Sequence, residues 1–266
     1  MRQLNFDSLP LVDVALRASL ATSTKLTFEG LNEVRNALQG EFPTMTELEQ
    51  FQIPPGVPGA SMELGPGQVP GAVFAGRPDG VSVIVQSQLL VARWVEPPRV
   101  GTAAEPVAYP RYPALRASLN RIMEAFSQAF RFENLPVVTV NMSYTNFLRI
   151  PHDFPVLQRY FSPLVQFGAA ACARRVHIVE ASWQEDSGLD VRFRLRQLIL
   201  TTLGQKVEGS ELTTAAGRCL KSPASPMDAL DGIHARLQEF FYSILSDDAQ
   251  REWGLQGASD VGSVAS

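Results

Sequence analysis

The stretch VSVIVQSQLLVARWV, residues 81–95, decides the fold class that this sequence predicts. Valines alternate with other side chains from Val81 to Gln86, and an apolar run from Leu89 to Val95 follows. A period of two and a high content of β-branched residues are typical of strands. The dipeptide Asp79-Gly80 just before them is a turn signal. We therefore predict two consecutive strands here.

A helix and a long strand are predicted next. Apolar residues recur at helical spacing between Ala114 and Arg131, and Pro113 suits the first turn, where its missing N–H costs nothing. Pro136 then interrupts the chain. From Val137 to Ile150 apolar and polar residues alternate again, which predicts a strand with one apolar and one polar face.

The rest of the chain supplies further strands and helices. Predicted strands lie at residues 11–20, 169–181, 189–202 and 213–220, and predicted helices at 28–38, 230–245 and 247–253. A further short helix is predicted to start in the turn at 151–155 and to run through Tyr160. Thr27 and Ser225 stand where N-caps are expected. Because each long amphipathic helix needs a sheet on which to bury its apolar stripe, this order predicts an α+β fold. We expect a mainly antiparallel sheet with helices 114–131 and 230–245 on one face.

The two halves of the chain, about 9–132 and 137–254, give similar strings of elements. Both have the form β-α-β-β(-β)-α, which predicts two pseudo-repeats, although mixed domains often give such strings by coincidence. Residues 53–80 differ in composition, since thirteen of these 28 are Pro or Gly, and predict an irregular arm. A domain boundary here is the alternative, but the elements before it are too few to bury a core alone. We predict a single α+β domain over residues 1–254 and a disordered tail at 255–266.

Several short motifs follow one another in a recognisable order. They are Gln86-x-Gln88, Arg93-Trp94, Tyr109-Pro110-Arg111-Tyr112, Tyr144-x-Asn146 and Glu252-Trp253-Gly254. In this order the chain resembles a sporadically distributed prokaryotic protein family of unknown function, and the opening Leu9–Val14 is similar to the family's first strand. One departure is that Gln88 runs straight into Leu89, so the turn there is shortened or the strand continuous. The resemblance implies a fold rather than an activity.

Composition and charge argue against several classes of protein. Apolar residues make up 45% and charged residues 19%, which is ordinary for a globular protein. The net charge of −4 does not favour nucleic acid or an anionic membrane as a partner. The N-terminus lacks an apolar signal core, and no apolar run approaches the roughly 20 residues that span a bilayer. Cys172 and Cys219 are expected to be reduced thiols, with a disulfide as the alternative, and we predict a cytoplasmic protein.

No catalytic, cofactor or metal signature stands out. The histidines His152, His177 and His234 have no cysteine or second histidine at ligand spacing, so no metal site is predicted. None of the three has an evident catalytic partner in the sequence. There is no P-loop, nucleophile elbow or dinucleotide-binding motif. We therefore predict no catalytic residue and no cofactor, and favour a protein that is not an enzyme.

Polar and aromatic residues in and near the predicted strands are the candidate binding residues. The first set lies around the motifs: Gln86, Gln88, Arg93, Trp94, Arg111, Tyr112, Asn141, Tyr144 and Asn146. Amides inside a sheet need hydrogen-bond partners, and a ligand groove or a buried structural network explains them equally well.

The second set is a row of cations on one face of the strand 189–202: Arg192, Arg194 and Arg196. Such a row could hold phosphates or an acidic partner. The alternative is a solvated strand face paired with acids such as Glu180, Glu208 or Glu211.

These observations favour a non-catalytic factor that binds a protein or peptide. The sporadic distribution of the family suggests, by association, an accessory role in prokaryotic defence or a toxin–antitoxin setting. The alternative is an enzyme or sensor for a phosphorylated or nucleotide-like ligand. We also expect a homo-oligomer, most simply a two-fold dimer, or a stable complex with another protein. The 53–80 arm or a sheet edge is expected at the contact.

Overall fold

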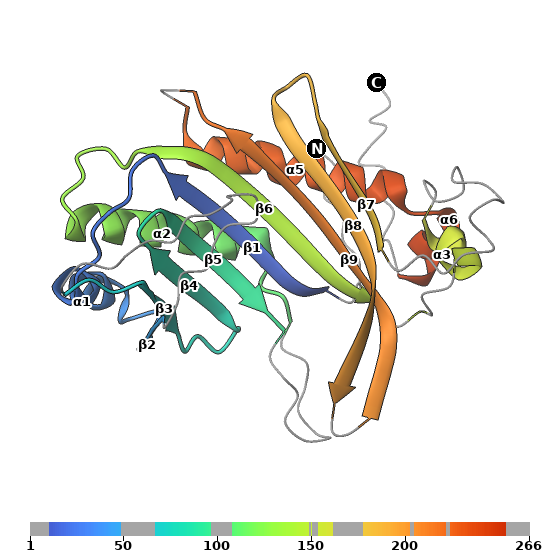
Figure 1. The fold of residues 1–266 in the computed structure, drawn as a ribbon, viewed down its shortest axis with the longest axis horizontal. Coiled ribbons are helices and arrows are strands. Elements are labelled where there is room, and N and C mark those ends of the chain that lie inside the picture. Colours follow the sequence, from blue (N-terminus) through green and yellow to red (C-terminus); the bar gives the residue numbers. More distant parts are fainter. Residues whose placement is uncertain are drawn as a thin grey trace, which may run out of the picture.

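The fold is built on one continuous antiparallel sheet. The structure, a computed structural model, describes residues 11–48, 67–96, 108–148, 150, 154–161, 178–202, 205–221 and 224–253. Nine strands pair in the order β2-β3-β4-β5-β1-β6-β9-β8-β7 (Figure 1). The predicted α+β class with a mainly antiparallel sheet is therefore confirmed.

The elements alternate between strands and helices along the chain. The strands are β1 (Leu11–Leu20), β2 (Thr44–Glu47), β3 (Gly71–Ala75), β4 (Val81–Gln86), β5 (Leu89–Val95), β6 (Val137–Leu148), β7 (Ile178–Gln184), β8 (Leu189–Thr202) and β9 (Gln205–Cys219). The helices among the described residues are α1 (Phe28–Leu38), α2 (Arg111–Ala129), α3 (Phe154–Tyr160), α5 (Pro226–Ile244) and α6 (Asp247–Glu252). Among the described residues, no helix is long and apolar enough to cross a membrane.

The two halves of the chain share one topology. In the first half the sheet order is β3-β4-β5-β1, and in the second it is β7-β8-β9-β6. Each half begins with a strand and a helix, continues with antiparallel strands and ends with a long helix. The two first strands, β1 and β6, pair antiparallel at the centre of the sheet, with Leu16 opposite Met142. The predicted pseudo-repeat is therefore visible in the strand order, with β2 as an addition to the first half.

Both long helices cover the same face of the sheet, as predicted. Figure 1 shows α2 and α5 side by side behind the strands. Their fully buried residues, among them Leu119 and Phe126 of α2 and Ile233 of α5, join one core with Val14 and Leu16 of β1. Burying each such side chain contributes roughly 1.5–3 kcal/mol. The sheet and the two helices thus share a continuous apolar interior.

Serine and threonine caps set the start of three helices. The Thr27 hydroxyl accepts a hydrogen bond from the Gly30 N–H at 3.1 Å, and Ser225 accepts from the Asp228 N–H at 3.3 Å. Ser246 does the same for Ala249 at 3.2 Å. Each cap satisfies a backbone donor that the first turn leaves without a helical partner. The predicted starts of α1, α5 and α6 rest on these side chains.

Some elements differ from the sequence-based expectation. Residues 71–75, inside the expected irregular arm, form β3 and pair with both β2 and β4, while residues 49–66 lie outside the described residues. The turn between β4 and β5 has only two residues, Ser87 and Gln88, so the departure from the family pattern is a shortened turn. Strand β9 begins eight positions earlier than predicted, and the predicted tail at 255–266 lies outside the described residues.

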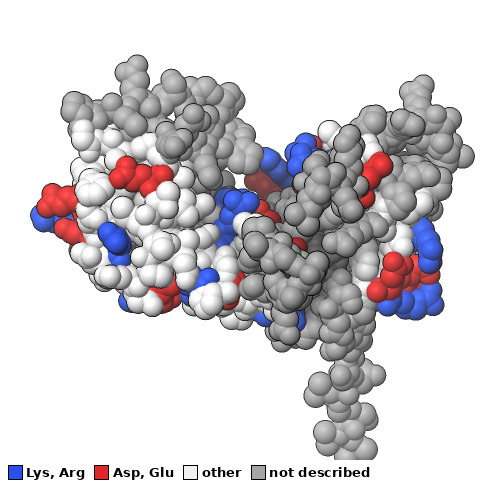
Figure 2. Space-filling view, turned by 90° about the horizontal axis from the view of Figure 1, so that it is seen from below, with Lys and Arg blue, Asp and Glu red and all other residues white. Residues whose placement is uncertain are grey.

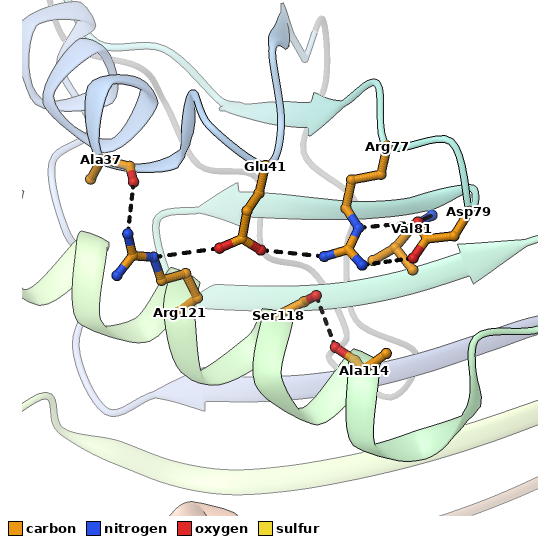
Figure 3. A network of polar contacts seen from close by, with 8 residues as sticks. All are labelled: Ala37, Glu41, Arg77, Asp79, Val81, Ala114, Ser118 and Arg121. Carbon is orange, nitrogen blue, oxygen red and sulfur yellow. Dashed lines mark hydrogen bonds and ion pairs between the residues drawn. The ribbon is translucent and has the colours of Figure 1, made fainter.

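A polar network ties the end of α1 to the β3–β4 turn and to α2 (Figure 3). Glu41 lies between two guanidinium groups, 3.3 Å from Arg77 and 3.8 Å from Arg121. Arg77 also binds Asp79 through two hydrogen bonds of 3.0 and 2.6 Å. Asp79 in turn accepts the backbone N–H of Val81 at 3.2 Å, where β4 begins. The network therefore fixes the turn more directly than it fixes the helices.

Candidate functional site

The sheet has a second face on which no described helix lies, and we call it the open face, although it also carries a buried apolar cluster of Ala15, Ile84, Leu89 and Val91. Since side chains alternate along a strand, the register decides which residues share it. Arg93 of β5 is paired with Ala15, and Arg17 of β1 with Asn141. The same alternation places the β8 arginines on this face. Two separately predicted sets of polar residues, Arg93 with Asn141 and the arginine row, thus share one surface.

The centre of the open face carries a partly buried cation, Arg17. Its guanidinium donates to the Ser143 hydroxyl at 2.9 Å and to the Asn141 side-chain oxygen at 3.4 Å. Burial lowers the pKa of Arg17, while nearby Asp13 opposes that effect. Asp13 itself is engaged by Arg93, whose Nε donates to it at 3.0 Å. This hydrogen bond raises the pKa of Arg93 and so favours the charged form of its guanidinium.

The predicted arginine row on β8 is only partly neutralised. Arg196 makes two hydrogen bonds to Glu211, of 2.6 and 2.9 Å. Arg194 lies 3.8 Å from Glu180, and its buried Nε makes no hydrogen bond. Arg192 is exposed, and among the described residues it makes no ion pair. The expected pairing with Glu180 and Glu211 is therefore present, whereas Glu208 accepts a hydrogen bond from Gln197 instead.

Acidic groups interrupt the basic ones over the surface. Asp190 lies on β8 in the same alternation as Arg192, and Glu180 of β7 is paired in register with Arg194. Figure 2 shows blue and red atoms interspersed over the described surface seen from below, with no continuous basic patch. On a surface of mixed charge, recognition depends on the pattern of the charges rather than on a single sign.

The aromatic members of the first predicted set lie on the opposite, helix-covered face. Trp94, Val14, Tyr144 and Thr214 stand in register across four neighbouring strands. Trp94 and Asn146 are 2% and 1% exposed. The structure therefore separates Arg93 and Asn141 from Trp94, Tyr144 and Asn146, although these residues are near one another in sequence.

His234 of α5 joins this aromatic cluster. Its ring stacks on Tyr112 of α2, with centroids 3.9 Å apart and an interplanar angle of 11°. Its Nδ1 is 2.9 Å from the Tyr144 hydroxyl. Burial lowers the pKa of His234 to about 4, against the opposing charge of Asp231. His234 therefore has structural partners that the sequence did not reveal, whereas His152 and His177 lie outside the described residues.

An ion pair between α2 and α5 borders the cluster. Arg116 binds both carboxylate oxygens of Asp231, at 2.8 and 3.0 Å, and the Tyr112 hydroxyl donates to the same group at 2.7 Å. Burial would raise the pKa of Asp231, but these hydrogen bonds lower it overall. Burial also raises the pKa values of Tyr109, Tyr112 and Tyr144. At neutral pH the tyrosines stay protonated and the imidazole stays neutral.

Several buried polar atoms of this cluster make no hydrogen bond to any described residue. They are the Trp94 indole N–H, the Tyr109 hydroxyl, the Thr214 hydroxyl and both side-chain atoms of Asn146. The Tyr109 hydroxyl is close enough to Tyr144 to influence its pKa, but the two hydroxyls lack hydrogen-bond geometry. Each such atom costs on the order of 1–3 kcal/mol. The cluster is thus an interior feature that the surrounding packing holds in place.

The remaining predicted residues fall elsewhere. Gln86 ends β4 and is 3% exposed, Gln88 is exposed in the two-residue turn, and Arg111 begins α2. Among the described residues, no group of three or more His, Cys, Asp or Glu could hold a metal ion.

Sequence reasoning missed Asp13 and Arg17, although both lie in the polar alternation of residues 11–20. It also missed Arg116 and Asp231, and the sequence holds no signal that could have paired these two.

Comparisons with known proteins add little. No family model matches the chain, and no curated protein matches it. A solved structure described as "KH domains" aligns with 94% of this chain, at 6% identity and a TM-score of 0.21. The chain covers 66% of that structure's length. At this TM-score the likeness supports no conclusion about fold or function.

Proposed function

We propose that the protein is a non-catalytic binding factor that acts in the cytoplasm and takes a protein partner on the open face of its sheet. The observation that carries the proposal is the arrangement of β8, where Arg192 is exposed and makes no ion pair with any described residue, and where Arg194 is only half-buried and lies 3.8 Å from Glu180. Guanidinium donors of this kind favour carboxylates on a partner. An accessory role in prokaryotic defence or a toxin–antitoxin pair is part of this proposal.

The mixed charge of the face favours a protein over a phosphorylated ligand. Glu180, Asp190 and Glu211 lie on the same face as the arginines. A phosphate or polyphosphate bound at Arg192 would meet these carboxylates and be repelled. A protein surface can place acids opposite the arginines and a base opposite Asp190, which gives specificity through complementary charges.

The proton-transfer groups of the described residues do not favour catalysis on this face. The neutral imidazole of His234 is on the other side of the sheet, stacked on Tyr112 and bonded to Tyr144. The carboxylates of Asp13 and Glu211 are engaged by Arg93 and Arg196. Carboxylates whose oxygens already accept hydrogen bonds from arginines suit recognition better than proton transfer.

The test compares partner recovery by the wild type with recovery by a charge-reversed face. The full chain with a tag is used to recover partners from the source cells, in parallel with Arg192→Glu/Arg194→Glu. The matched control is Arg35→Glu, an exposed arginine on α1. The proposal expects one protein to copurify with the wild type and the control but not with the double variant. Its measured affinity should fall at least tenfold in the double variant, and should weaken with salt.

Two outcomes would overturn the proposal. One is a partner that binds the double variant as tightly as the wild type. The other is a phosphorylated small molecule that copurifies with the wild type and is lost from the double variant, which would establish the ligand-sensor alternative instead.

A further inference from the structure

The two edges of the sheet are not alike. At one edge β2 has four residues and ends in Glu47. At the other β7 has seven residues, with Ile178 52% and Trp183 37% exposed. Among the described residues, no backbone hydrogen bond reaches the outer side of β7. Short or charged edges resist association, whereas a longer edge with exposed apolar side chains invites another strand.

The β7–β8 turn shows which backbone groups of β7 point outward. The Glu185 N–H donates to the Leu189 carbonyl at 2.9 Å. The Gly188 N–H donates to the Glu185 carbonyl at 2.8 Å and closes the turn, and Gly188 has a φ of 74°. Since hydrogen-bonded pairs alternate along an antiparallel ladder, Val179, Ala181 and Trp183 bond to β8. The residues whose N–H and C=O groups face away from the sheet are therefore Ile178, Glu180, Ser182 and Gln184.

This edge is complementary to itself. We infer that two copies of the chain associate by antiparallel pairing of their β7 strands about a two-fold axis at Ala181. In that register Glu180 of one copy faces Ser182 of the other, and Ile178 faces Gln184, so that each outward residue meets an outward residue. Each of these pairs can exchange two backbone hydrogen bonds.

The side chains fit the same register. Val179 of one copy lies opposite Trp183 of the other at a non-hydrogen-bonded pair, where side chains approach most closely. Trp183 is already oriented by Phe240 of α5, with ring centroids 5.1 Å apart. A register centred on Glu180 would instead place two like charges directly opposite each other, which is destabilising. The two-fold at Ala181 therefore buries an apolar row without opposing like charges.

Such a contact is small. A seven-residue edge with one apolar row is at the low end of interface size, so the dissociation constant is expected on the order of micromolar. A symmetric contact between identical patches forms a closed dimer rather than a fibre. Pairing at the β7 edge does not depend on the partner proposed for the open face.

Sedimentation of the full chain over a range of concentrations tests the association. The wild type should pass from monomer to dimer as its concentration rises toward ~100 µM, well above a micromolar dissociation constant. Ser182→Pro removes an outward N–H without removing a bond to β8, and should raise the dissociation constant at least tenfold. Ser182→Ala keeps that N–H and should dimerise like the wild type. A wild type that stays monomeric, or a proline variant that dimerises normally, overturns the inference.

A cross-link tests the register even if the proline variant fails to fold. In a chain with Cys172→Ser and Cys219→Ser, Ala181→Cys would meet its own copy across the axis. The two Cα atoms would be about 4.5 Å apart, within the range that a disulfide bridges. Mild oxidation should therefore give a covalent dimer, whereas Ser182→Cys, which faces Glu180, should give little. Equal cross-linking of both variants, or none of either, contradicts the two-fold at Ala181.

Discussion

At the scale of single residues, His234 shows how packing can make a titratable group sensitive to acid. Its pKa is lowered to about 4 by burial, while in the unfolded chain it is about 6.5. Between these values the unfolded chain binds more protons than the folded one, so stability rises with pH. The stability is fully present above about pH 6.5 and is lost as the pH falls toward 4.

This linkage predicts the behaviour of His234→Gln. The variant should lose less stability than the wild type between pH 7 and pH 4.5, by about 1–2 kcal/mol after allowance for the exposed part of the ring. Urea unfolding at both pH values measures this difference. Tyr242→Gln, an exposed change on the same helix, serves as the control and should follow the wild-type profile. Parallel profiles of wild type and His234→Gln would contradict the buried, neutral imidazole.

The network of Figure 3 predicts unequal roles for two carboxylates. Asp79 makes two hydrogen bonds to Arg77 and accepts the Val81 N–H at the start of β4. Glu41 makes longer contacts, and its side chain is 46% exposed. Asp79→Ala should therefore cost about 1–2 kcal/mol, and Glu41→Ala less than about 1 kcal/mol. Equal losses in chemical unfolding would show that the two acids act as one unit.

At the scale of elements, two helix glycines should respond oppositely to the same change. A Cβ added to Gly30 of α1 would lie 2.6 Å from the Phe130 ring, whereas one added to Gly232 of α5 would meet nothing within 4 Å. Gly232→Ala should stabilise the protein by about 0.5–1 kcal/mol through helix propensity. Gly30→Ala should destabilise it by about 1–3 kcal/mol through overpacking. Thermal unfolding of both variants measures the signs, and a stabilised Gly30→Ala would mean that Phe130 moves aside freely.

The elements that could be predicted are those with a local signal. Alternation located β1, β4, β6 and β8, and a continuous apolar run located β5. Apolar stripes with serine or threonine caps located α1 and α5. Strand β2 has four mostly polar residues, and β3 lies in a stretch rich in Pro and Gly, so both exist because of the strands that pair with them. Their pairing is a tertiary effect that overrides local propensity.

The candidate site was less predictable than the fold because it depends on register and on contacts distant in sequence. Alternation could place Arg93 and Trp94 on opposite faces of one strand. It could not show that β1 and β6 would pair and bring Arg17 against Asn141 and Ser143. Alternation also could not predict that His234 contacts Tyr144, which lies 90 positions earlier in the chain.

At the scale of the whole molecule, the central β1–β6 pairing predicts that neither half is stable alone. If the chain is divided after residue 134, the strand of the β1–β6 pair in each fragment has an unpaired edge. The long helix in each fragment also loses the side that contacts the other long helix. Each fragment alone should lack cooperative unfolding, and mixing the two should restore it, as measured by circular dichroism and size-exclusion chromatography. A half that unfolds cooperatively by itself would refute the single domain that the sequence predicts. The intact chain, under the same conditions, is the reference.

The same pairing bears on how the protein is synthesised. Arg17 and Ser143, which bond across the β1–β6 seam, are 126 positions apart in the chain. At about 5–20 residues per second, roughly 6–25 s separate their emergence from the ribosome. During this interval the edge of β1 that β6 will cover has no partner, and β1 carries the apolar row of Val14, Leu16 and Ala18 beside it. The nascent first half is therefore open to strand pairing with neighbouring nascent chains, and a ribosome-associated chaperone that shields this edge would raise the yield of folded protein.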